Sequence, residues 1–69
     1  MLHKAVKGFS YAFEGVKHQF LLTLSEGVYH FFHIEDGNVT ERINLGADEN
    51  EAMIIFKQEL ALFQDHTPP

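Results

Sequence analysis

The chain contains no cysteine, few basic residues and no long apolar run. Without cysteine it can form no disulfide bond and carry out no thiol chemistry. Five basic residues against ten acidic residues give a formal charge of −5, which argues against a nucleic-acid partner because such proteins neutralise phosphates with cations. The longest apolar runs, such as Met53–Phe56, are too short to span a bilayer. No apolar stretch typical of a secretory signal follows the first residues, so we expect a soluble cytoplasmic protein with no membrane partner.

What remains is a short chain rich in apolar residues. Its 69 residues are 45% hydrophobic and include seven phenylalanines, which predicts one globular domain over residues 1–69. A domain of this size buries only about 60% of the surface that its unfolded chain exposes, so its stability is marginal without further support. With disulfides excluded, the usual supports are a bound metal or a partner chain, and the third option is an unusually apolar core.

The first half of the chain alternates between apolar and other residues in segments separated by acidic-glycine pairs. Residues 16–34 contain two such strands joined at Glu26-Gly27, and another strand precedes Glu14-Gly15. Glycine supplies the positive φ that two-residue hairpin turns need. Pairing around both turns places the large apolar side chains on a common face, with Phe9 opposite Phe20. A slip of one residue would turn every side chain over, so this agreement predicts an antiparallel meander.

The pairing of a fourth strand depends on the length of the third turn. A two-residue loop would set Phe31 opposite a polar residue. A three-residue loop, Asp36-Gly37-Asn38, instead sets Phe31 opposite Ile43 and Glu35 opposite Val39. Such loops hold a residue in the left-handed region, which asparagine and glycine tolerate. We therefore predict the three-residue loop.

After Gly46 the apolar period changes from two to that of a helix. Asp48 followed by Glu51 is typical of a helix N-cap, and the apolar residues beyond it recur at helical spacing over about residues 49–64. The sequence thus predicts an α+β fold with two layers, in which a four-stranded antiparallel β-meander is followed by one C-terminal amphipathic α-helix packed on one face. The predicted core face of the sheet comprises Phe9, Tyr11, Phe13, Val16, Phe20, Leu22, Leu24, Tyr29, Phe31, Val39, Ile43 and Leu45.

One helix leaves the other face of the sheet without a cover. In the predicted register Leu21 lies directly opposite Phe32 on that face, so its apolar residues form a patch ringed by polar side chains, a pattern that marks interaction sites. The first half of the helix is also apolar over a wide arc. The candidate interface residues are Leu21, Val28, Phe32, Ile34, Ile54 and Ile55. We expect them to bind a second copy of the chain, giving a homodimer or higher oligomer, or else another protein.

Five histidines is a high number for so short a chain. Two of them share the core face with two carboxylates near one end of the sheet: His18, His33, Glu35 and Glu41. Imidazole and carboxylate together suit zinc or another transition metal. The alternative is that these residues simply meet water beyond the end of the helix. His30 lies on the other face and His3 near the N-terminus, so neither joins this cluster.

Catalytic chemistry finds little support in the sequence. Neither serine has a histidine and carboxylate pair in the predicted register, and the glycines separate strands instead of forming a phosphate-binding loop, so we expect no enzyme and no cofactor. The first hypothesis is a small non-catalytic regulator, accessory subunit or inhibitor that self-associates through its apolar sheet face. The alternatives are a metal- or small-ligand-binding module and, further off, a single-stranded nucleic-acid-binding protein.

Overall fold

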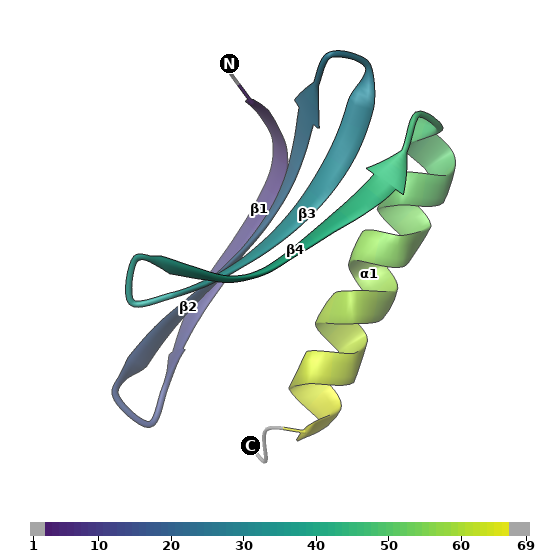
Figure 1. Ribbon diagram of the computed structural model, residues 1–69. Helices are drawn as coiled ribbons and strands as arrows, with labels where there is room; N and C mark the ends of the chain where they lie inside the picture. Colours follow the sequence, from purple (N-terminus) through teal and green to yellow (C-terminus); the bar gives the residue numbers. More distant parts are fainter. Residues whose placement is uncertain (1–2, 67–69) are drawn as a thin grey trace.

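The computed structural model describes residues 3–66, with side chains through Phe63, so both ends of the expected 1–69 domain lie outside the described residues. The strands form one antiparallel sheet in chain order, and the helix follows, as predicted. Figure 1 shows the helix lying along one face of the twisted sheet. The elements are β1 (Lys4–Phe13), β2 (Val16–Ser25), β3 (Val28–Glu35), β4 (Asn38–Gly46) and α1 (Glu49–His66).

All three hairpin turns consist of an acidic residue and a glycine, both with positive φ. Glu14 has a φ of 51°, Glu26 51° and Asp36 48°, and the glycine that follows each lies between 76° and 87°. This is the mirror-image turn whose twist matches that of the flanking strands. Glu35 consequently pairs with Asn38 across a two-residue loop. The predicted three-residue loop, with Glu35 opposite Val39, is therefore wrong.

An extra residue in β4 reconciles this short loop with the apolar pattern. Ile34 pairs with Val39 and His33 with Glu41, so Thr40 is a β-bulge, and its hydroxyl donates to the His33 carbonyl oxygen at 3.2 Å. Beyond the bulge Phe31 pairs with Ile43 as predicted, but the register shifts again between Tyr29 and His30, so that Tyr29 pairs with Gly46. Between the turn and the bulge, each side chain of β4 lies on the opposite face of the sheet from the predicted one. Val39 consequently lies on the uncovered face and is 59% exposed, so its prediction as a core residue is wrong.

A second bulge exchanges faces near the start of β1. Phe9 pairs with Phe20 as predicted, but Lys7 pairs with Leu22 and Ala5 with Thr23, which leaves Val6 as the extra residue. Side chains before Val6 therefore lie on the opposite face of the sheet from the one that simple alternation predicts. The His3 ring is one of these, because its Nδ1 lies 3.0 Å from the hydroxyl of Thr23 on the uncovered face.

The core lies between α1 and the inner strands. Its buried members are Phe20, Leu22, Tyr29, Phe31, Leu45, Ala52 and Phe56. The helix packs on β2, β3 and β4, whereas β1 reaches it through the ring contact between Tyr11 and Phe63. Phe9, on β1, is consequently 41% exposed, which corrects its prediction as a core residue.

Polar contacts fix the start of the helix against the sheet. The Asp48 carboxylate accepts a hydrogen bond from the Glu51 backbone N–H at 3.0 Å, which confirms the predicted N-cap. The Tyr29 hydroxyl on β3 donates to Glu49 at 3.4 Å. The second contact joins the first turn of α1 to β3.

Candidate metal centre

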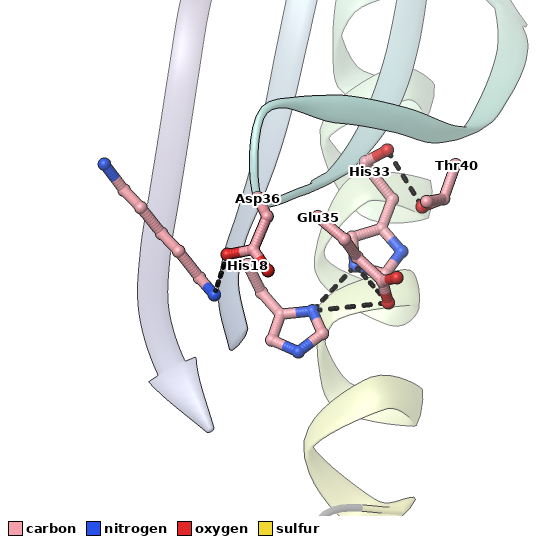
Figure 2. A network of polar contacts seen from close by, with 6 residues as sticks. His18, His33, Glu35, Asp36 and Thr40 are labelled. Carbon is pink, nitrogen blue, oxygen red and sulfur yellow. Dashed lines mark hydrogen bonds and ion pairs between the residues drawn. The ribbon is translucent and has the colours of Figure 1, made fainter. Parts of the chain in front are cut away.

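Three potential metal ligands converge at one end of the helix-covered face. His18 on β2 pairs directly with Glu35 on β3, and His33 lies two residues before Glu35, so alternation puts all three side chains on one face. Figure 2 shows the two imidazole rings and the Glu35 carboxylate turned toward one another. One donor atom from each lies within 4.8 Å of the others.

The distances among these atoms suit a shared ion. His18 Nδ1 lies 3.1 Å from His33 Nε2, and Glu35 Oε1 lies 3.6 Å from the first and 3.8 Å from the second. The imidazole pair can share one hydrogen bond, but the carboxylate is too distant for another. A point equidistant from the three atoms is about 2.0 Å from each, which matches zinc bonds of about 2.0–2.2 Å to imidazole and carboxylate.

Aromatic side chains wall both imidazoles. His18 and His33 are 6% and 8% exposed, and the Phe63 ring from α1 lies 5.0 Å from each of their ring centres. Phe20 stacks on His33 at 4.6 Å. Glu35, in contrast, is 41% exposed at its side chain. The cluster is therefore closed toward the core and open toward solvent on its carboxylate side.

The surroundings favour the neutral form of His33. Burial lowers its pKa and the adjacent His18 lowers it further, while Glu35 and Glu41 act in the opposite direction. Neutral imidazole is the form that binds metals. Glu41, the fourth predicted ligand, lies directly opposite His33 but is not among the three converging groups.

The candidate interface residues are divided between two surfaces. On the uncovered sheet face Leu21 lies opposite Phe32 as predicted, but the His3 ring at 5.4 Å and the Arg42 guanidinium at 5.6 Å cover part of Phe32. Phe32, like Leu21, Val28 and Ile34, is half-buried. On α1, Ile54 is 57% exposed and Ile55 half-buried. Whether these residues form an interface stays a prediction.

Two features of these sites have no signal in the amino-acid sequence. Phe63 is recognisable as an apolar helix residue, but no pattern indicates that it covers the histidines. The second feature is a pairing of His3 with His30 on the uncovered face, where their ring centres are 5.1 Å apart. The Val6 bulge creates this pairing, and apolar alternation carries no signal for it.

Comparisons with family models, with curated proteins and with solved structures found no match to this chain. Within residues 3–66, no helix is long and apolar enough to cross a membrane. Any functional inference therefore depends on the geometry of the sites themselves.

Proposed function

We propose that the protein is a metal-binding module that holds a divalent transition-metal ion between His18, His33 and Glu35. The observation that carries this proposal is the convergence of three donor atoms within 3.1–3.8 Å of one another, close enough to share one ion. The Glu35 carboxylate lies 3.6–3.8 Å from both ring nitrogens, beyond hydrogen-bond distance, so neither imidazole holds it by a direct hydrogen bond.

The donor set narrows the class of ion. Two imidazoles and one carboxylate suit zinc and its first-row neighbours better than calcium or magnesium, which prefer oxygen ligands alone. Three protein ligands leave at least one coordination position for water or an added ligand. The exposed side of Glu35 provides room for that position.

Further acidic groups near the cluster support a cation as its occupant. A surface pocket of about 220 Å³ borders the Phe63 cover and includes Glu41 and Glu59 among its lining residues. Of these two carboxylates, Glu41 also lies directly opposite His33, and nearby negative charge raises the local concentration of cations. The core of so small a domain contributes little stability, and a bound metal would add to it.

Zinc titration by calorimetry and thermal unfolding tests the proposal. We expect one zinc per chain, and at a free concentration 100 times Kd a gain of about 2.7 kcal/mol in unfolding free energy, which corresponds to a rise in Tm on the order of 10–20 °C. His33→Gln should abolish both effects. His30→Gln, which alters a histidine on the opposite face, is the matched control and should preserve them. Equal zinc binding by the two variants, or none by the parent, would contradict the proposal.

A second candidate function is self-association through the uncovered sheet face. The Thr40 bulge adds Val39, 59% exposed, beside Ile34 on that face, which enlarges the apolar patch beyond its predicted extent. We propose a homo-oligomer in the cytoplasm as this alternative, with Val39→Glu as its test. A molecular mass by light scattering that is the same for parent and variant, and equal to one chain, would exclude it.

A further inference from the structure

The uncovered face holds a second polar site, built around His30 and Arg42. A surface pocket of about 250 Å³ opens there, lined by His3, by the end of β2 at Ser25, and by residues of the β2–β3 turn, β3 and β4. Arg42 lies opposite Phe32 and Asn44 opposite His30, so the pocket follows β3 from the turn toward the middle of the strand. None of these residues belongs to the metal cluster.

Two buried polar groups in the pocket lining have no hydrogen-bond partner among the described residues. They are the hydroxyl of Ser25, whose residue is 6% exposed, and Nδ1 of His30. Leaving a buried donor or acceptor unpaired costs about 1–3 kcal/mol. Such a cost is removed when a ligand supplies the missing partner, and both groups can donate a hydrogen bond to it.

Arg42 places a cation in the lining of this pocket, in a chain whose net charge is −5. Burial lowers the pKa of His30, and Arg42 and His3 lower it further. The Arg42 guanidinium lies over the Phe32 ring, 5.6 Å from its centre, and this contact favours one position for the charge. Glu26, the acidic member of the lining, belongs to the β2–β3 turn, at the opposite end of the pocket from Arg42.

We propose that this pocket binds a small oxyanion, a carboxylate or phosphate group, between Arg42 and His30. Arginine is suited to both groups because its planar fork donates two parallel hydrogen bonds. The Ser25 hydroxyl donates to the rest of the bound molecule. The His3 ring forms one wall of the pocket, where it stands edge-on to His30 and Phe32 and shares a side-chain hydrogen bond with Thr23. A shift of this ring exposes the two buried groups to the ligand.

Titration of the full chain with inorganic phosphate and, separately, with acetate tests the proposal, followed by ¹H–¹⁵N NMR. We expect saturable shifts of Ser25 and His30 at millimolar concentration with at least one of the two anions, and at least a tenfold loss of affinity in Arg42→Gln. Lys17→Gln is the matched control, because Lys17 is an exposed cation on the same face but outside the pocket.

Ser25→Ala separates binding from folding. Removing an unpaired buried hydroxyl should leave the ligand-free protein at least as stable as the parent while weakening its anion binding. Absence of saturable shifts with both anions would overturn the proposal, as would an equal loss of affinity in Lys17→Gln and Arg42→Gln, which would indicate general charge attraction. Because the measurements need no metal, they are unaffected by the outcome of the zinc titration.

Discussion

The two faces of the sheet each carry a pair of histidines, and the pairs differ in the charge placed beside them. On the helix-covered face His18 and His33 lie 5.3 Å apart with a carboxylate close to both. On the uncovered face His3 and His30 lie 5.1 Å apart with a guanidinium nearby. Similar ring spacing thus occurs in two opposite electrostatic settings, one suited to a cation and the other to an anion.

The pairs also differ in how they are held. The rings of His18 and His33, the inner pair, are nearly parallel and packed among aromatic residues, including Phe63 from the helix. His3 and His30 form the outer pair. The outer rings meet at 71°, and His3 reaches its position from the end of an edge strand. The comparison indicates that histidine spacing alone does not define a site. In our proposals the neighbouring charge distinguishes the two ligands, and the depth of packing distinguishes how firmly each pair is held.

The largest expected effect comes from removing the cover of the inner pair. Phe63→Ala should lower the free energy of unfolding by about 2–4 kcal/mol, because a ring packed against several others is replaced by a cavity. His3→Ala, which removes the exposed member of the outer pair, should cost less than about 1 kcal/mol, as expected for a surface position. Urea denaturation measures both. Equal losses would show that the two pairs are held alike.

Neutralising the inner carboxylate should sharpen the difference in ligand preference. Glu35→Gln removes one metal ligand and should weaken zinc binding at least tenfold, or about 1.4 kcal/mol, whereas Arg42→Gln should leave it unchanged. Competition with a chromogenic chelator gives both affinities. Unaltered zinc binding by Glu35→Gln would mean that the imidazoles alone hold the ion.

The smallest expected effect is on the pH dependence of stability. The pKa of His30 is lowered in the folded state by burial, Arg42 and His3. Below about pH 6.5 the unfolded chain therefore binds a proton at His30 more readily than the folded chain does, and the free energy of unfolding decreases as the pH is lowered. His30→Gln should therefore lose less stability than the parent between about pH 7.5 and pH 5.5. Urea denaturation at both values is the measurement, and identical losses would contradict the assignment.

The sequence predicts this fold because its apolar period changes once, from two to helical, and because its turns carry recognisable residues. The pairing of Phe9 with Phe20, the Asp48 cap and the helix start at Glu49 all follow from such local signals. The bulges at Val6 and Thr40 do not, because a strand with one extra residue contains the same kinds of residue as a regular strand. Their effect is confined to the strand ends, which is why the inner cluster could be predicted and the outer histidine pair could not.

The extra residue at Thr40 allows the third hairpin to change its length by one residue without changing how its two strands pair. Without Thr40, Val39 would still lie opposite Ile34 and Glu41 opposite His33, now in a regular ladder. An insertion or deletion at most other points of a strand would turn its remaining side chains over. The hairpin that carries His33 and Glu35 thus contains a position where the loss of one residue keeps the pairing on both sides of it.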